Sequence, residues 1–281
     1  MLSGAKGPDV DSFRGVAITR VCDGARTLEV DRAATEEPLE IRLHDRPFAV
    51  VMRTPGADRE LAAGFLLSER VLRTSDDLGT IAHCTDPGAE HPENIVNVRL
   101  TDAAASVLDR VFDARRNVTT NSSCGMCGRL TIESLRVDGP PISSNWTISS
   151  SMIVAIPDRL REAQVVFDQT GGLHAAGLFT REGQLDGFAE DVGRHNAVDK
   201  VVGRLLMQDR LPLSDHLLFV SGRTSFEIVQ KAFLAGIPIV AAVSAPSSLA
   251  IELAEECGVT LIGFLRGQSF NIYACPARVV I

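Results

Sequence analysis

The chain has 281 residues, of which 45% are hydrophobic and 23% charged, a composition typical of a folded globular protein. Its 28 basic and 36 acidic residues give a formal net charge of −8, which offers no support for nonspecific nucleic-acid binding. No apolar run approaches the roughly 18 residues of a membrane span, and residues 1–14 lack the apolar core of a signal peptide. We therefore expect a cytoplasmic protein with no membrane association, whose six mostly isolated cysteines are reduced thiols.

The first half of the chain predicts a small α+β domain. Residues 1–14 are rich in Gly, Pro, Asp and Ser and are predicted to be disordered. A helix is predicted to begin near Asp58, which could cap it, because apolar residues follow at helical spacing. Because 281 residues are long for one core, we place an N-terminal domain at residues 15–140. Alternating apolar and polar residues predict antiparallel strands at 16–21, 39–43, 48–52 and 95–100.

Cys124 and Cys127 form a Cys-x-x-Cys pair flanked by glycines. Such a pair can ligate a metal, cycle as a disulfide or carry sulfur as a persulfide. A structural zinc site needs a second close pair of Cys or His, and the sequence has none. A thioredoxin-like pair would lie between a strand and a helix, whereas polar residues 117–123 precede Cys124. We expect the pair to lie on a mobile loop, where a thiol can react in turn with a donor partner and with an acceptor partner.

The second half of the chain, residues 141–281, predicts a three-layer α/β/α domain. A boundary rich in Ser, Pro and Gly spans residues 138–151 and contains Trp146. A helix, a hairpin and an amphipathic helix are predicted next, at 156–167, at 174–180 with 184–189, and around 198–206. Apolar strands at 217–220, 237–243 and 259–264 then alternate with helices at 226–235 and 248–257. This alternation predicts a parallel sheet with helices on its faces.

Three polar loops follow these three strands and should share one edge of the sheet. Ligands of open α/β sheets bind beyond the carboxyl ends of the strands, and the N–H groups at a helix start attract anions. The loops therefore favour a phosphate or pyrophosphate ligand, although Ser and Thr in any one of them could simply cap a helix. The sequence lacks the motifs of an ordinary NTPase or dehydrogenase. The loops read SGRTS at 221–225, SAPSS at 244–248 and RGQS at 266–269.

Two more polar clusters lie in this half. His174 follows a Gly pair, and it could be a site residue or merely a satisfied core histidine. Residues 190–200, EDVGRHNAVDK, combine acids and bases at a helix start, where His195 would tend to stay neutral and could exchange a proton. In the alternative, Asp191 only caps the helix, while Arg194 and Lys200 pair with Glu190 and Asp199.

Taken together and in order, these motifs resemble the FdhD family of formate dehydrogenase accessory sulfurtransferases. The resemblance covers nearly the whole chain after Gly15. It implies a C-terminal domain with a cytidine-deaminase-like fold, but the helix starts lack the cysteines that would bind a deaminase zinc ion, which excludes deamination. The motifs are TPGADRELAAGFL from 54, CGMCGR from 124, TGGLH from 170, EDVGRHNAVDK from 190, SGRTS from 221, VSAPS from 243 and GFLRG from 263.

The resemblance implies a sulfur relay in a homodimer. A cysteine desulfurase would load a persulfide on Cys124, with Cys127 as helper or alternate carrier, and Arg129 would favour the attacking thiolate. The sulfur would pass to a molybdenum or tungsten bis(molybdopterin guanine dinucleotide) cofactor, bound as a substrate with no permanent metal, before the cofactor enters the formate dehydrogenase apoenzyme. The residues expected to bind this cofactor are Phe264, Leu265, Arg266, Gly267, Gln268, Ser269, Ser221, Gly222, Arg223, Thr224, Ser225, His174 and His195.

Three further expectations complete this interpretation. Arg223, Arg266 and Lys231 should anchor the pyrophosphate groups of the cofactor. A competing hypothesis is a non-catalytic chaperone that binds the cofactor and docks it into the apoenzyme. A third hypothesis is a structural zinc protein, which would contain stoichiometric metal.

Overall fold

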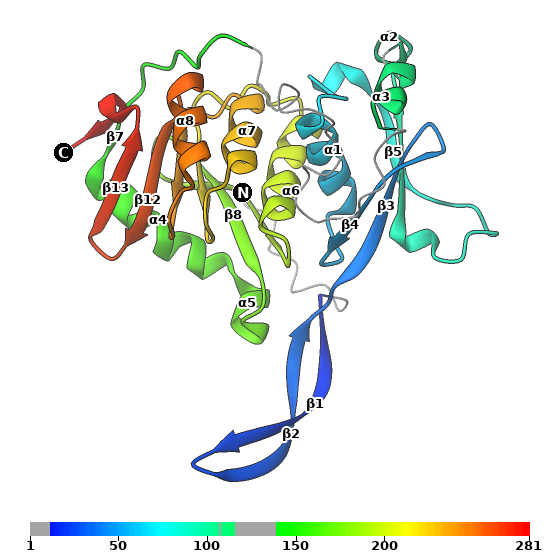
Figure 1. Ribbon diagram of the computed structural model, residues 1–281, viewed down its shortest axis with the longest axis horizontal. Helices are drawn as coiled ribbons and strands as arrows, with labels where there is room; N and C mark the ends of the chain where they lie inside the picture. Colours follow the sequence, from blue (N-terminus) through cyan, green and yellow to red (C-terminus); the bar gives the residue numbers. More distant parts are fainter. Residues whose placement is uncertain (1–11, 107, 116–138) are drawn as a thin grey trace.

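The protein is a mixed α/β structure built around two main sheets (Figure 1). The structure, a computed structural model, describes residues 12–106, 108–115 and 139–281. The smaller sheet has the strand order β4-β3-β6-β5, and the larger one has the order β13-β12-β11-β10-β8-β9. Helices α1 and α6 lie side by side between the two sheets (Figure 1). No helix in these described ranges is long and apolar enough to cross a membrane.

The smaller sheet carries the strands predicted for the first half of the chain. Leu39, Ile41 and Leu43 alternate with more exposed neighbours along β3 and are fully buried, as the period of two predicts. β5 was not predicted, because its residues LGTIAH are partly exposed and weakly patterned. The elements are β3 (Glu37–Leu43), β4 (Arg46–Arg53), β5 (Leu78–His83) and β6 (Ile95–Leu100), with helices α1 (Asp58–Ser68), α2 (Asp102–Ala105) and α3 (Leu108–Arg115).

The start of α1 differs from the prediction. The N-cap residue is Ala57, in the left-handed region at φ 54°, and its side chain makes no capping hydrogen bond. Asp58 lies inside the first turn, where it accepts two hydrogen bonds of 3.0 Å from the buried guanidinium of Arg53. The prediction that Asp58 caps the helix was therefore wrong, because the Arg53 guanidinium binds its carboxylate instead.

A two-stranded hairpin extends away from both sheets (Figure 1). It consists of β1 (Phe13–Cys22) and β2 (Ala25–Ala34), which pair along their full length. The strand predicted at 16–21 is confirmed within β1, which begins at Phe13. β2 was not predicted, because charged residues interrupt its apolar ones and the strand has no core face.

The larger sheet has a parallel centre with antiparallel edges. β10, β11 and β12 are parallel, as predicted, while β8 and β13 run antiparallel to the neighbours that they join. β13 was missed because residues 266–269 were interpreted as a loop, whereas they form a tight turn with Gly267 at φ 54°. The strands are β8 (His174–Phe179), β9 (Leu185–Asp191), β10 (Leu217–Val220), β11 (Ile239–Ala242), β12 (Thr260–Arg266) and β13 (Ser269–Ala274).

Helices cover both faces of this sheet. Leu218 and Val220 of β10 pack in one apolar core with α6, α7 and α8, whereas Leu217 and Phe219 pack in a second core with α4. The helix predicted at 156–167 is instead two helices, because Gln164 adopts a non-helical conformation between them. The helices are α4 (Ser150–Ala163), α5 (Val165–Thr170), α6 (Arg194–Met207), α7 (Phe226–Leu234) and α8 (Ser248–Cys257), and the short strands β7 (Ile148–Ser149) and β14 (Val279–Val280) pair beside them.

The two sheets are joined by a close contact between α1 and α6. A Cβ atom added to Gly203 of α6 would lie 1.9 Å from the carbonyl oxygen of Glu60, and one added to Gly64 of α1 would lie 2.0 Å from that of Asp199. Only glycine allows the two backbones to approach this closely. The larger apolar core accordingly runs without interruption from the small sheet to the helices of the large one.

Candidate functional site at the carboxyl edge of the large sheet

The carboxyl edge of the large sheet collects most of the described site residues. β8 is antiparallel to β10, so His174 at its start lies at the edge where β10 ends, and it pairs with Asp191 at the end of β9. The loop after β10 is joined to the next one by the 3.3 Å hydrogen bond from Thr224 N to the oxygen of Ala245. The predicted common edge for these loops is confirmed.

The segment after β12 lies beside the loop after β11. Phe264 N donates to the oxygen of Ser244 at 3.2 Å, and Arg266 Nε donates to the oxygen of Val243 at 2.9 Å. Phe264 is 39% exposed at φ 53°, and the Arg266 guanidinium lies 5.9 Å from its ring centre. Leu265 is fully buried, so its side chain belongs to the core and cannot touch a ligand. Residues 266–269 are exposed.

His174 faces the glycine of the SGRTS loop. A Cβ atom on Gly222 would lie 3.3 Å from His174 Nδ1 and 3.7 Å from Arg194 Cδ, so these three residues form a close group. Burial lowers the pKa of His174, and the nearby charges of Arg194 and His195 lower it further. The His174 ring is therefore neutral near pH 7 and can accept or donate a hydrogen bond.

Arg194 contributes an unsatisfied hydrogen-bond donor to this group. Its Nε atom is buried and has no hydrogen-bond partner within the part of the chain that the structure describes. The hydroxyl of Thr224, whose side chain is 1% exposed, is also buried without a partner there. A buried hydrogen-bond donor without a partner lowers the stability of the fold. The oxygens of a bound phosphate could accept hydrogen bonds from both the Arg194 guanidinium and the Thr224 hydroxyl.

His195, Ser225 and Glu227 form a second group at the start of α7. His195 Nε2 lies 3.1 Å from Ser225 Oγ and 3.6 Å from Glu227 Oε2. Burial would raise the pKa of Glu227, but hydrogen bonds from His195 and Ser225 and from its own N–H lower it to about 2. Ser225 is the N-cap residue of α7 yet makes no capping hydrogen bond, because its hydroxyl is used here.

This arrangement leaves some of the backbone N–H groups in the first turn of α7 free to bind an anion. The Glu227 carboxylate takes one N–H group of the first turn, so it competes with any bound phosphate there. Ser247, by contrast, caps α8 through a 3.3 Å hydrogen bond from Ala250 N. For the loop at 244–248, the simpler interpretation as a helix cap is thus confirmed.

Most of the charged residues in EDVGRHNAVDK have structural roles. Lys200 Nζ contacts the fully buried Asp191 at 2.7 Å, and it donates to the oxygen of Thr54 at the same distance. Asp191 also accepts a hydrogen bond from Thr54 N at 3.2 Å and one from Asn196 at 2.9 Å. The motif therefore ties the site edge to the residues that follow β4.

The ion pairs weighed in the sequence analysis are different in the structure. Glu190 accepts hydrogen bonds from the N–H groups of Val166 and Phe167 instead of pairing with Arg194 or Lys200. Asp199 pairs with Lys231 at 2.7 Å, and Ser68 of α1 accepts from the same ammonium group at 2.9 Å.

Of the three basic residues expected to anchor pyrophosphate, only two are accessible. Arg223 and Arg266 are exposed at the carboxyl edge. Lys231 is only 8% exposed, and its ammonium group is neutralised by Asp199 between α1, α6 and α7. The expectation that Lys231 anchors pyrophosphate was wrong, because this burial depends on the docking of α1, which the local sequence does not reveal.

Four of the six cysteines lie among the residues that the structure describes. Cys124 and Cys127 lie outside the described residues. Within the described ranges, Cys22, Cys84, Cys257 and Cys275 are free thiols, and no group of three His, Cys, Asp or Glu side chains could hold a metal ion. Burial, with a smaller effect of Glu256, raises the pKa of Cys257 to about 11, so this thiol is a poor nucleophile.

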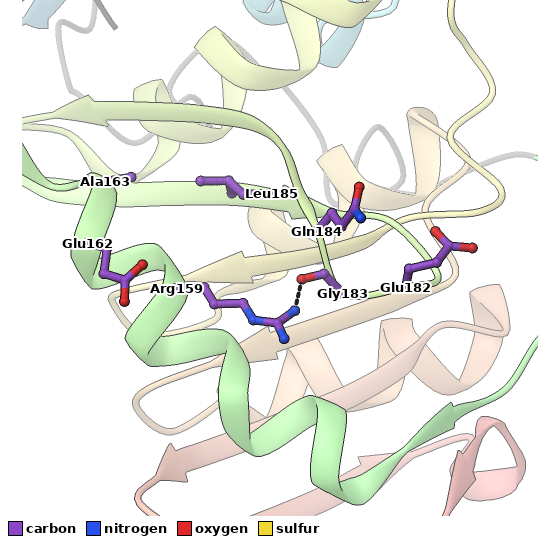
Figure 2. A pocket seen from close by; sticks show the side chains of 7 residues that line it. All are labelled: Arg159, Glu162, Ala163, Glu182, Gly183, Gln184 and Leu185. Atoms are coloured by element: carbon purple, nitrogen blue, oxygen red, sulfur yellow. Dashed lines mark hydrogen bonds between the residues drawn. The ribbon is translucent and has the colours of Figure 1, made fainter. Parts of the chain in front are cut away.

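An open cavity of about 530 Å³ lies beside the β8–β9 turn, at the opposite end of β8 from His174. It is formed by the end of α4 and the β8–β9 turn, where Arg159 donates to the oxygen of Gly183 (Figure 2). Glu162, Glu182 and Gln184 also line it, and none of the residues expected to bind the cofactor does. It is therefore separate from the candidate site.

The chain is similar in sequence to known proteins along most of its length. Residues 34–280 match the sequence model of the FdhD/NarQ family. The chain belongs to the FdhD/NarQ family. It is 50% identical over 274 residues to the sulfur carrier protein FdhD of Streptomyces avermitilis, covering 94% of each chain. It is 46% identical over 268 residues to the protein of the same name from Sulfurisphaera tokodaii, covering 94% of this chain and 98% of the relative.

A solved structure extends the family relationship to the fold. The crystal structure of a candidate formate dehydrogenase accessory protein from Desulfotalea psychrophila superposes with a TM-score of 0.75 at 25% identity. The match covers 95% of this chain and 99% of that one. The mixed α/β architecture of this FdhD/NarQ member is therefore shared along nearly its whole length.

Proposed function

We propose that this protein is a sulfur carrier for formate dehydrogenase. The observation that carries the proposal is the 50% identity, over 94% of both chains, to a relative named sulfur carrier protein FdhD. A cysteine desulfurase gives the sulfur, and a molybdenum or tungsten bis(molybdopterin guanine dinucleotide) cofactor receives it before insertion into the apoenzyme. The Cys-x-x-Cys pair supports this role, because a persulfide carrier needs a nucleophilic thiol.

The loading step is a thiol exchange that needs no external oxidant. The thiolate of Cys124 attacks the outer sulfur of the persulfide on the desulfurase. A new sulfur–sulfur bond forms on Cys124, the bond within the donor persulfide breaks, and the donor cysteine leaves as a thiolate. Cys127 is the helper or alternate carrier. Among the described cysteines, the high pKa of Cys257 makes it a poor competitor.

The carboxyl edge of the large sheet is where the cofactor binds as substrate in this proposal. Its pyrophosphate groups are anionic, and Arg194 offers a buried, unpartnered donor beside His174. Arg223 and Arg266 are exposed at the same edge, and the Phe264 ring, which is 39% exposed, offers a flat apolar surface. Binding through such contacts weakens as salt increases.

The wider organisation of the protein follows the same proposal. Residues 15–140 and 141–281 act as two domains, and the C-terminal one belongs to the cytidine-deaminase-like folds with helices on both sheet faces. The protein works as a homodimer. The helix starts at 194 and 226 carry Arg, His, Phe and Glu instead of paired cysteines, so this fold would serve binding instead of zinc-dependent deamination.

Intact-mass spectrometry tests the loading step. The wild type, Cys124→Ala and Cys127→Ala are incubated with a cysteine desulfurase and cysteine, and each mass is measured before and after dithiothreitol. We expect a reducible gain of one sulfur atom in the wild type and none in Cys124→Ala. If all three proteins stay unmodified while cofactor binding survives both substitutions, the non-catalytic cofactor chaperone replaces the carrier as the explanation.

A further inference from the structure

His195 lies at the carboxyl edge in contact with a hydroxyl and a carboxylate that the proposed function does not use. Its Nε2 atom lies 3.1 Å from Ser225 Oγ and 3.6 Å from Glu227 Oε2. The side chains of His195 and Glu227 are 9% and 12% exposed, so water screens this pair only weakly. A mostly buried imidazole beside a carboxylate changes its protonation state when the charge around it changes.

Two unpaired hydrogen-bond donors adjoin this group. Arg194 precedes His195 at the start of α6, and its buried Nε atom has no partner among the described residues. Thr224 precedes Ser225 and is 1% exposed, and its hydroxyl has no partner in the same part of the chain. An anion that accepts hydrogen bonds from these donors therefore adds negative charge beside the His195 ring.

Arg194 and Glu227 act on the His195 ring in opposite directions. The guanidinium of Arg194, on the same turn of α6, disfavours a second positive charge next to it. The Glu227 carboxylate favours the imidazolium. Burial would raise the pKa of Glu227, but hydrogen bonds from His195, from Ser225 and from its own N–H lower it to about 2. Glu227 is therefore ionised throughout the neutral pH range, and only the balance with Arg194 changes when an anion binds.

The other charged or titratable groups near His195 change this balance little. Asp199, one turn further along α6, interacts with His195 but is neutralised by Lys231 of α7, whose Nζ lies 2.7 Å from its Oδ1. His174 on β8 also interacts with His195. Burial and the charges of Arg194 and His195 lower the pKa of His174, so its ring stays uncharged near pH 7.

We propose that a diphosphate bound at the carboxyl edge takes up one proton from solvent at His195, and that Glu227 is the positioning residue that sets the pH at which this happens. The bound anion offsets the charge of Arg194, so the imidazolium paired with Glu227 becomes the favoured form. No covalent bond changes. The inference rests on the proposed function, because it takes this edge as the site of the cofactor's pyrophosphate. It follows that the protein holds the cofactor more tightly at lower pH.

The test needs a diphosphate whose own charge does not change with pH. The terminal phosphate of a nucleoside diphosphate titrates at a pKa of about 6, which would hide a proton taken up by the protein. Two guanosines joined by a bridging pyrophosphate have no terminal phosphate, and each phosphate keeps one negative charge across the neutral range. Any pH dependence in the binding of this probe therefore comes from the protein.

Isothermal titration calorimetry of the full-length chain with this probe, from pH 5.5 to pH 8.5, measures the linkage. The wild-type Kd should increase by roughly tenfold or more over this range, since one proton changes it by at most about tenfold per pH unit. Titrations at one pH in buffers of different ionisation enthalpy count the protons that are taken up. We expect a positive count that does not exceed one.

Four variants assign the proton to its residue. His195→Gln should bind with a Kd that does not depend on pH, because an amide does not titrate. Glu227→Gln should move the wild-type profile to lower pH, because the imidazolium loses its carboxylate, and Glu227→Asp should recover part of that shift. Glu255→Gln, which removes an exposed carboxylate from the last turn of α8, should leave the profile in place. A purely structural role of Glu227 would change the affinity equally at every pH.

The outcomes separate this inference from the proposed function. A profile that survives His195→Gln, or that Glu227→Gln leaves at the same pH, overturns the proposal. If His195→Gln does not fold, the wild-type proton count and the Glu227→Gln profile decide the question. Wild-type binding that does not depend on pH overturns the proton uptake and leaves the cofactor site standing, whereas the absence of binding at every pH refutes both.

Discussion

Replacing Gly203 with alanine should damage the contact between α1 and α6 severely. The added methyl carbon would lie 1.9 Å from the oxygen of Glu60 and 2.6 Å from the N atom of Gly64, whereas carbon and oxygen normally stay more than about 3 Å apart. The two helices would have to separate by about 1 Å or more, although the core on both sides is continuous. Overpacking of this kind costs about 3 kcal/mol.

Urea denaturation and thermal melting measure this cost. In an unobstructed helix the same substitution would stabilise the protein by about 0.5–1 kcal/mol, so the clash reverses the expected sign. For a chain of this size, about 3 kcal/mol corresponds to a decrease of roughly 10 °C in the melting temperature.

A matched control separates the clash from the backbone effect. Gly24, in the β1–β2 turn at φ 80°, has no atom within 4 Å of an added Cβ, so Gly24→Ala should cost only the local strain of about 1 kcal/mol. A Gly203→Ala protein as stable as the wild type would refute the close helix contact.

Three further predictions test the charges of the site and its support. Asp199→Asn should destabilise the protein by about 3–5 kcal/mol in urea, because it leaves the Lys231 ammonium buried and unpaired, and Asp199→Leu with Lys231→Met should recover much of that loss. Glu227 has a pKa lowered to about 2, so its charge stabilises the fold above pH 4.5, and this contribution is lost as the pH falls toward 2. The stability advantage of the wild type over Glu227→Gln should therefore shrink across that window, and a difference independent of pH would contradict the assignment. The His174 pKa should lie below 6.5 in an NMR titration and rise in Arg194→Met, because a nearby positive charge is removed, and an unchanged titration would show that the two side chains are not coupled.

Sequence patterns predicted the elements whose boundaries are set locally. The predicted strand at 217–220 and helix at 248–257 match β10 and α8 residue for residue, because an apolar run and a Ser-to-Gly helix interval mark their ends. The common edge of the loops followed from the strand–helix alternation. β2 escaped prediction because its side chains face water on both sides.

The roles of individual charges could not be read from the sequence. Lys231 and Arg194 both occur at helix positions near polar motifs, yet one is neutralised by Asp199 and the other keeps an unpartnered Nε. The difference arises from the docking of α1, which joins Ser68 to Asp199 across 131 positions, and from the antiparallel placement of β8, which pairs Ala176 with Val220. Local spacing carries no information about such contacts.

A sulfur chase tests the carrier function most directly. The protein is loaded with ³⁵S from labelled cysteine by a cysteine desulfurase, separated from the donor, and mixed with the bis(molybdopterin guanine dinucleotide) cofactor. The label on the cofactor is then counted after the protein is unfolded and removed. The account predicts that label moves from the wild type to the cofactor and that Cys124→Ala delivers none. Label that stays on the protein, or that reaches the cofactor equally from Cys124→Ala, would contradict it.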